Sequence, residues 1–591
     1  MSTSANRYIH SVDGLRAVAV LAVLFYHLGI NWIPGGFLGV DLFFVISGYV
    51  ITGLILDSIS RSGTLDLRAF YLSRIRRLVP ALVAMVVMTL LYISTYAPET
   101  LRRFLSDLPY VFTGSMNWAL VNRKQDYFQT IGRPPLLQHT WSLAVEAQFY
   151  LIWPLVLLFI LRYFGKKNIS FAALAIALAS GLALFIYSVQ IDTHESAVSH
   201  VYFGTDTHSI GLFLGSALAV SWHPQNLTRE ISKRAQDFVD LIGVFGLLGL
   251  LSTFLFINES DATLYRIAFP VSAIFGCATL ISVVHPASRF APILSIKPMI
   301  WIGERSYGIY LWHWIVFQLT RPSIDLVGDD WALYALRILV VFALADISLR
   351  YVELPVRRGY FELWFRGMKY RTKAVRFRQK MGTVVISIST IALAVVASIS
   401  GINKADDLSA KAAAAAKAAS QSSNNTNQDG VVTALSTPGL WVTGDSVILG
   451  IRNVLAQYQK IELINARVGR QIGELIQVAK TDQQYVSKSP VVLNMGNNNK
   501  LSEGDVVTLM EIVKNQPKIV IVNTAVPRPW KDSNNELIAK VVSRYANTTI
   551  IDWNRISTNH PEYFAEDGVH LNPPGVNAYV SAILEVLDKQ P

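Results

Sequence analysis

The chain of 591 residues is rich in apolar side chains and poor in charge. Hydrophobic residues make up 52% of the sequence and charged residues 16%, whereas soluble proteins average about 25% charged residues. This composition argues against a purely soluble protein and excludes a disordered or collagen-like chain. The only cysteine, Cys277, excludes an intrachain disulfide framework, a cysteine-based zinc site and an iron–sulfur cluster. We expect no metal site.

The N-terminal two thirds of the chain predict a multi-pass helical membrane domain. This region holds about eleven apolar stretches near the length that a bilayer requires, roughly 20 residues each. Arg16 interrupts the first stretch and further spans follow it, so it is not a cleavable signal peptide. The predicted spans lie near residues 12–30, 37–57, 78–96, 143–162, 170–190, 207–222, 237–257, 267–285, 298–320, 332–350 and 382–401.

The net charge of +11 is better explained by membrane topology than by nucleic-acid binding. Lys and Arg cluster after the second, fourth, sixth and tenth predicted spans, whereas the loops at 191–206 and 322–331 contain neither. By the positive-inside rule, the N-terminus is cytoplasmic. An odd number of spans then makes the C-terminal part extracytoplasmic. We expect a plasma-membrane protein whose partners include the lipid bilayer but no nucleic acid.

The C-terminal third predicts a separate α/β domain. Residues 402–436 are Ala-rich and then Ser/Asn-rich, a composition typical of a linker. Residues 437–591 alternate β-rich runs with helix-length segments, which predicts a three-layer domain with a parallel sheet. The β-rich runs lie at 440–443, 461–465, 490–495, 518–523 and 548–552. The predicted divisions are the membrane domain at 1–355, a basic cytoplasmic loop and last span at 356–401, the linker and the outer domain.

Candidate catalytic groups follow the predicted strands of the outer domain. Ser446 ends the sequence GDS at 444–446, where we expect it to be exposed at the carboxyl end of a parallel strand. Asp567 and His570 lie near the C-terminus. A histidine can take the serine proton, and a carboxylate can hold its tautomer. An Asn amide after the third strand and the backbone N–H groups around Gly469 can donate to an oxyanion.

This ordered set resembles the SGNH (GDSL-like) family of hydrolases and acyltransferases over residues 437–591. The segments GDSVILG, ARVGRQ, NTAVPRPW and HPEYFAEDGVHLNPPG look like those of OatA-type peptidoglycan O-acetyltransferases. The third block reads GNNN where the family usually has a sequence like GTNG. The roles that the resemblance implies are nucleophile for Ser446, base for His570, orienting carboxylate for Asp567, and oxyanion donor for Gly469 and Asn498.

Ionisable residues within the predicted spans are costly and are therefore candidates for function. With the topology above, four of them fall towards the outer half of the membrane: His27, Asp41, Glu146 and His313. Arg74 and Arg77 lie instead at the cytoplasmic mouth, before the third span. A positive-inside anchor would explain these arginines, but guanidinium groups also grip phosphates bidentately, as a clamp for a phosphorylated donor requires.

Residues 8–355 resemble the acyltransferase-3 family of integral membrane acyltransferases. Arg16 and His27 match its Arg-X10-His pattern, Arg74 and Arg77 match its RxxR pattern, and the segments GVDLFFVISGY and WSLAVEAQFY are also similar. The resemblance implies acetyl-CoA as the cytoplasmic donor, bound by the two RxxR arginines. It also implies that His27 is essential, as general base or acceptor-activating group.

Other membrane residues have two interpretations. Asp41 and Glu146 either orient His27 and tune its proton affinity, or form a buried pair that locks helices together. Where the family often has TDT followed by Arg, this chain reads TDTH at 205–208, so that His208 could substitute. Tyr310, like Tyr307, is either a core aromatic residue or a group that passes acetyl onward.

The combined motifs predict a two-stage acetyl relay: the membrane domain takes acetyl from CoA, and Ser446 transfers it to a sugar hydroxyl. The expected acceptor is the C6 hydroxyl of N-acetylmuramic acid in peptidoglycan, where acetylation blocks muramidases such as lysozyme. Alternatives are N-acetylglucosamine, or a lipopolysaccharide O-antigen or capsule. Two further alternatives are an extracytoplasmic acetyl esterase, and a transporter or sensor whose outer domain only binds ligands.

Overall fold

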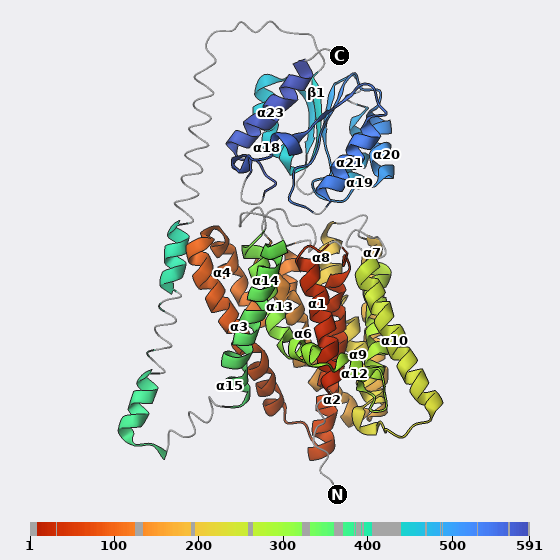
Figure 1. The fold of residues 1–591 in the computed structure, drawn as a ribbon, viewed down its shortest axis with the longest axis vertical. Coiled ribbons are helices and arrows are strands. Elements are labelled where there is room, and N and C mark those ends of the chain that lie inside the picture. Colours follow the sequence, from red (N-terminus) through yellow and green to blue (C-terminus); the bar gives the residue numbers. More distant parts are fainter. Residues whose placement is uncertain are drawn as a thin grey trace. The chain divides into compact units, whose positions relative to one another are not determined.

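In the computed structural model, the chain forms two compact units. Figure 1 shows a helical unit and a unit in which helices cover a sheet. The described residues are 9–30, 32–123, 134–190, 195–257, 264–321, 331–359, 370–382, 385, 392, 395–404, 439–466, 470–484, 486, 488–528, 530–564 and 568–588.

The first unit is a bundle of helices whose outer surface is apolar. Phe171 and Leu178 on α7, and Phe245 on α10, are 72%, 74% and 63% exposed. Large apolar side chains in such numbers on the outside fit a surface that faces lipid. The helices are α1 (His10–His27), α2 (Gly39–Ser62), α3 (Leu67–Tyr96), α4 (Leu101–Thr113), α5 (Met116–Asn122), α6 (Trp141–Tyr163), α7 (Lys167–Gln190), α8 (Glu195–Phe203), α9 (Ile210–Ser221), α10 (Lys233–Phe256), α11 (Phe269–Val284), α12 (Ala291–Leu294), α13 (Lys297–Leu319), α14 (Trp331–Ile347) and α15 (Leu354–Arg357).

Among the described residues, seven helical runs are long and apolar enough to cross a membrane. They are Gly36–Ser62, Leu67–Tyr96, Gln138–Tyr163, Lys167–Val189, Lys233–Phe256, Arg266–Val284 and Trp331–Arg357. Three other predicted spans coincide with α1, α9 and α13, which are shorter or carry more charge. Half of the last predicted span, 382–401, falls outside the described residues. The total of about eleven spans therefore stays a prediction.

Helix α3 begins well before the predicted span at 78–96. The Asp66 side chain caps its N-terminus by accepting a hydrogen bond from the Ala69 amide at 2.9 Å. The preceding helix α2 ends where Gly63 adopts a φ of +74°, a conformation that glycine reaches without steric cost. The early start of α3 places both arginines of the RxxR pattern, Arg74 and Arg77, on the helix itself.

Helices α2 and α9 approach each other closely at two glycines. A Cβ atom on Gly48 would lie 1.9 Å from the Leu212 carbonyl oxygen, and one on Gly215 would lie 2.1 Å from the Val45 carbonyl oxygen. Small residues at such crossings let helix backbones pack together in a membrane. This contact brings the start of α9 against the first half of α2.

The second unit contains a five-stranded parallel sheet in the order β2-β1-β3-β4-β5. The strands are β1 (Leu440–Gly444), β2 (Ile461–Ala466), β3 (Val491–Asn494), β4 (Ile519–Val522) and β5 (Thr548–Ile551), and each coincides with a predicted β-rich run. The helices are α18 (Ser446–Tyr458), α19 (Ile472–Asp482), α20 (Glu503–Val513), α21 (Lys531–Val542), α22 (Trp553–Ile556) and α23 (Pro573–Asp588). The predicted parallel α/β domain is confirmed.

Alternating strand residues build the two faces of this sheet. Val491 and Leu493 pack with α19, α20 and α21 on one face, whereas Val492 packs with α18 and α23 on the other. The same division is visible in Figure 1. Because each face has its own buried apolar cluster, the three layers form a complete core.

The close approach of α2 and α9 predicts that Gly48→Ala destabilises the membrane unit, by about 1–3 kcal/mol, because the new methyl group meets backbone atoms that cannot rotate away. Thermal unfolding of the detergent-solubilised full-length protein measures this. The matched control is Gly53→Ala on the same helix, where the nearest atom would lie 3.9 Å from the new Cβ. An equal loss in both variants would contradict the packing argument.

Candidate active sites

Ser446 lies at the turn from β1 into α18. β1 ends at Gly444, Asp445 is the N-cap residue and Ser446 is the first residue of the helix. The position at a strand end is as predicted, but the expected exposure is wrong, since Ser446 is only 4% exposed. The reason is that α18 packs on the sheet from its first turn, where Val447 and Ile448 are already core residues.

The carboxylate of Asp445 joins the ends of β1 and β3. Its Oδ1 accepts a hydrogen bond from the Val447 amide at 2.9 Å. Its Oδ2 accepts from the side-chain amides of Asn497 and Asn498, both at 2.9 Å. Asn497 also donates to Oδ1 of Asn494, the last residue of β3, at 2.7 Å. The Asp445 carboxylate therefore fixes both the turn that carries Ser446 and the segment that contains Asn497 and Asn498.

Arg470 joins the ends of β1 and β2 in a similar way. Its Nη1 donates to the carbonyl oxygens of Gly444 at 3.1 Å and Asn465 at 2.6 Å, and the residue is buried. The Asn498 amide donates to the Arg470 carbonyl at 3.2 Å. Both N–H groups of the Asn498 amide thus have acceptors, so it would have to exchange one bond to serve an oxyanion. Its oxyanion role stays a prediction.

Burial raises the pKa of Asp445 to about 6. The hydrogen bonds from Val447 and Asn497 oppose this shift, as do the nearby charges of His570 and Arg470. His570, the predicted base, thus acts electrostatically on Asp445, the residue before Ser446. Two other predicted residues, Asp567 and Gly469, lie outside the described residues. The catalytic roles in this domain therefore stay predictions.

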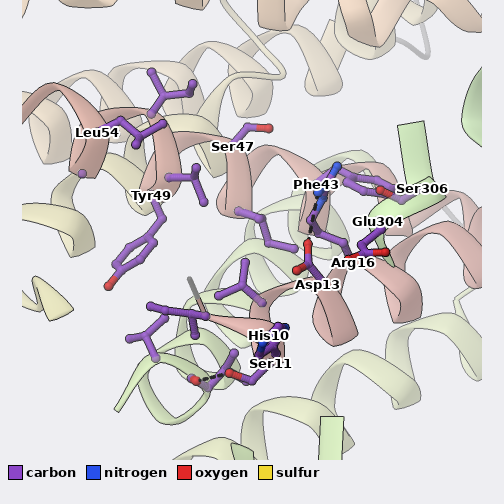
Figure 2. Close-up of a pocket in the computed structure, with 18 of the residues that line it drawn as sticks. His10, Ser11, Asp13, Arg16, Phe43, Ser47, Tyr49, Leu54, Glu304 and Ser306 are labelled. Atoms are coloured by element: carbon purple, nitrogen blue, oxygen red, sulfur yellow. Dashed lines mark hydrogen bonds and ion pairs between the residues drawn. The ribbon is translucent and has the colours of Figure 1, made fainter. Parts of the chain in front are cut away.

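The membrane unit contains a cavity of about 1400 Å³. The predicted residues Arg16, Arg74, Arg77 and Glu146 all line it. Figure 2 shows one wall, where Arg16 on α1 pairs with Asp13 at 3.3 Å. The cavity thus gathers residues that are far apart in the sequence into one site.

Positive charge is concentrated on this cavity. Arg74 interacts electrostatically with both Arg77 and Arg357, and the last of these also lines the cavity. Arg357 is 3.4 Å from the buried carboxylate of Glu353. Several guanidinium groups around one space are suited to an anionic ligand with more than one phosphate.

Glu146 belongs to the cavity and not to the surroundings of His27. Its Oε1 accepts a hydrogen bond from the Ser47 hydroxyl at 2.6 Å, and its Oε2 accepts from the Tyr150 hydroxyl at 3.0 Å. The interpretation that Glu146 orients His27 is therefore corrected. Tyr150 lies one helical turn after Glu146 in the same WSLAVEAQFY segment, so helical spacing could have identified this partner.

His27 and His313 meet away from the cavity lining. Nδ1 of His27 and Nε2 of His313 are 3.1 Å apart, and His313 is buried. A third histidine, which the sequence motifs did not indicate, lies beside this pair: the ring centroid of His139 is 6.0 Å from that of His313. His139 falls before the predicted span at 143–162 and two residues before the family-like segment WSLAVEAQFY.

Asp41 pairs with His208 and not with His27. Its Oδ1 is 3.1 Å from Nε2 of His208, and both residues are buried. The Nδ1 of the same ring is 2.6 Å from the Tyr202 carbonyl oxygen. Both interpretations of Asp41 are therefore corrected: its partner is His208, so it neither orients His27 nor pairs with Glu146. In the TDTH sequence at 205–208, Asp206 pairs with His200 at 2.9 Å.

Both the membrane domain and the chain as a whole have known relatives. Residues 9–350 match the family model described as an acyltransferase domain, and the chain belongs to this family. It is 33% identical to the peptidoglycan O-acetyltransferase OatA of Listeria monocytogenes, with 99% of each chain covered. It is 34% identical to the O-acetyltransferase OatA of Staphylococcus aureus NCTC 8325, over 98% of this chain and 96% of the relative.

Among solved structures, the chain is similar to a GDSL-like lipase from Bacteroides thetaiotaomicron, with 16% identity and a TM-score of 0.21. The likeness covers 28% of this chain and 95% of the lipase. The expected acyltransferase family is confirmed, and the protein is an enzyme of the O-acetyltransferase class.

The shared acceptor at Asp445 predicts a titration of its amide partners. In an NMR sample of residues 437–591, the side-chain amide signals of Asn497 and Asn498 should shift with a midpoint near pH 6, because Asp445 loses its charge as the pH falls through its pKa of about 6. Asp445→Asn should abolish the midpoint. The Asn534 amide, which donates to the carbonyls of Gly496 and Asn499, is the internal control. A midpoint near pH 4 would contradict the burial argument.

Proposed function

We propose that this acyltransferase O-acetylates a cell-wall polysaccharide, using acetyl from cytoplasmic acetyl-CoA and an acetyl-enzyme at Ser446. The observation that carries the proposal is the presence of two chemical sites in one chain. One is an arginine-lined cavity in a domain of the acyltransferase family. The other is a serine at a parallel-strand end with His570 nearby.

The cavity is the proposed donor site. Its volume of about 1400 Å³ exceeds that of typical small-molecule pockets, roughly 300–1,000 Å³, and accommodates a long nucleotide thioester. Arg74 and Arg77 would bind its phosphates, with Arg16 nearby on the wall. The basic loops favour a cytoplasmic opening and an extracytoplasmic sheet domain.

The two units then divide the reaction. His27, as general base or acceptor-activating group, would take a proton from the nucleophilic carrier that attacks the acetyl thioester, so that the acetyl–carrier bond forms and CoA leaves as the thiol. At the second site, Ser446 Oγ attacks the acetyl carbonyl, His570 takes the serine proton, and the departing carrier receives that proton. A sugar hydroxyl next attacks the acetyl ester, its proton passes through His570, and Ser446 Oγ is released as the alcohol.

The proposed acceptor is peptidoglycan, at the C6 hydroxyl of N-acetylmuramic acid. The name of the Listeria monocytogenes relative, which matches this chain over 99% of its length, supports peptidoglycan as the acceptor, and the C6 hydroxyl is the position that the family resemblance implies. Such a relay would bring acetyl groups to the outer side of the membrane, because CoA is charged and does not cross a bilayer unaided. Acetylation at that hydroxyl would hinder muramidases such as lysozyme.

Loss of the nucleophile should abolish acetylation of the wall. A deletion strain complemented with Ser446→Ala should contain no more base-labile acetyl on its muropeptides than the empty deletion strain, measured by mass spectrometry. Ser533→Ala, an exposed serine in the same domain, is the matched control and should restore wild-type levels. Full acetylation with Ser446→Ala would overturn the acetyl-enzyme. Acetyl that appears only on another surface polysaccharide would overturn the acceptor.

Removal of a clamp arginine should weaken donor binding. Arg74→Gln and Arg77→Gln should each reduce acetyl-CoA affinity by roughly 10- to 100-fold, the equivalent of the 1.5–3 kcal/mol typical of a charge-assisted hydrogen bond. Isothermal titration calorimetry on the detergent-purified full-length protein measures this. Arg68→Gln, an exposed residue of the same helix outside the cavity lining, is the control. Equal weakening by Arg68→Gln would indicate a general charge effect.

A further inference from the structure

The hydrogen bond between His27 and His313 has a direction that the surrounding backbone determines. Nδ1 of His313 is 2.6 Å from the Tyr310 carbonyl oxygen and 3.2 Å from that of Ile309. A carbonyl oxygen only accepts hydrogen bonds, so Nδ1 of His313 carries a proton. This assignment follows from the chemistry of the acceptor, since the heavy-atom positions alone do not distinguish tautomers.

His313 is therefore an acceptor at its other nitrogen. The residue is 1% exposed, and its ring neighbours are His27, His139, Tyr310 and Phe317. None of these neighbours is a carboxylate that would balance a charged ring, and an uncompensated charge in such surroundings is costly. In the neutral ring with a proton on Nδ1, Nε2 holds the lone pair.

His27 is the donor in its hydrogen bond with His313. Its Nδ1 is 3.1 Å from the accepting Nε2 of His313, so Nδ1 of His27 must be the donor. The Val23 carbonyl, one helical turn earlier on α1, is a second acceptor beside this ring. Edge contacts with Tyr26 and Trp314, both with ring centroids 5.0 Å away, hold the plane of the imidazole.

We propose that His313 is a positioning residue that fixes His27 in the tautomer with a proton on Nδ1, so that Nε2 is the basic atom. The proposal deepens the proposed function, because it rests on the role of His27 as a base in acyl transfer. A base needs its lone pair on the nitrogen that faces the reacting group, and a partner at the other nitrogen selects this tautomer.

The position of Tyr310 connects this pair to the donor cavity. Tyr310 lines the cavity, and its hydroxyl lies 2.6 Å from the Ser142 hydroxyl and donates to the His139 carbonyl at 2.8 Å. Its own carbonyl accepts the proton of His313 Nδ1. A single residue of α13 thus borders the cavity and sets the orientation of the histidine pair.

The test uses the full-length protein in nanodiscs with ¹⁵N-labelled histidine. Protonated and unprotonated ring nitrogens have separate NMR ranges, and His27→Asn identifies the His27 signals by their loss. The wild type should have a protonated Nδ1 and an unprotonated Nε2 at His27. His313→Gln should keep this tautomer, because its amide can donate to the Tyr310 carbonyl while its oxygen accepts from His27. His313→Leu should give a mixture of tautomers.

Activity separates positioning from a structural role. CoA release from acetyl-CoA should fall on the order of 10²-fold in His313→Leu, the lower range for loss of a general base, and His313→Gln should restore most of it. A wild-type His27 protonated on Nε2 would overturn the proposal. So would equal losses in the Gln and Leu variants when thermal unfolding and acetyl-CoA affinity match the wild type. Full activity in His27→Asn would overturn the role of His27 in the proposed function, while the NMR result on the tautomer would still stand.

Discussion

An ionisable side chain inside an apolar helix bundle needs a polar partner, and this requirement organises the first unit. Transfer of an unpaired charge or polar group out of water costs several kcal/mol. Asp41 on α2 meets this need through His208, which lies two residues before the start of α9. His27 on α1 meets it through His313 on α13. The first pair joins α2 to the segment between α8 and α9, and the second joins α1 to α13, so the helix arrangement and the polar groups specify each other.

Buried polar groups in the sheet domain also need polar partners, and they find them where the parallel strands end. In the order β2-β1-β3, the chain adds β2 on one side of β1 and then β3 on the other, and this reversal opens the edge of the sheet between the ends of β1 and β3. Asp445 and Asn497 meet there. Arg470 closes the neighbouring junction between β1 and β2. Ser446 is held by this network at the place where the topology creates a binding site.

Local sequence patterns predicted the elements well, because apolar runs and β-rich alternation are local properties. Ten of the eleven predicted spans coincide with helices, and the five β-rich runs coincide with strands. Pairing across helices was not predictable, since Asp41 and His208 are separated by 167 positions and their contact depends on how α2 packs on α9. The burial of Ser446 was missed for a similar reason: the packing of α18 on the sheet is a tertiary property.

The direction of the hydrogen bond between His27 and His313 is set by a backbone carbonyl and does not require a ligand. A side-chain partner such as a carboxylate could itself gain a proton and reverse the hydrogen bond, whereas the Tyr310 carbonyl has no second protonation state within reach. Because that carbonyl lies three residues before His313 on the same helix, the geometry is local to α13. Groups on α13 therefore set which atom donates and which accepts in the bond between His313 and His27. This in turn determines which nitrogen of His27, on α1, is basic.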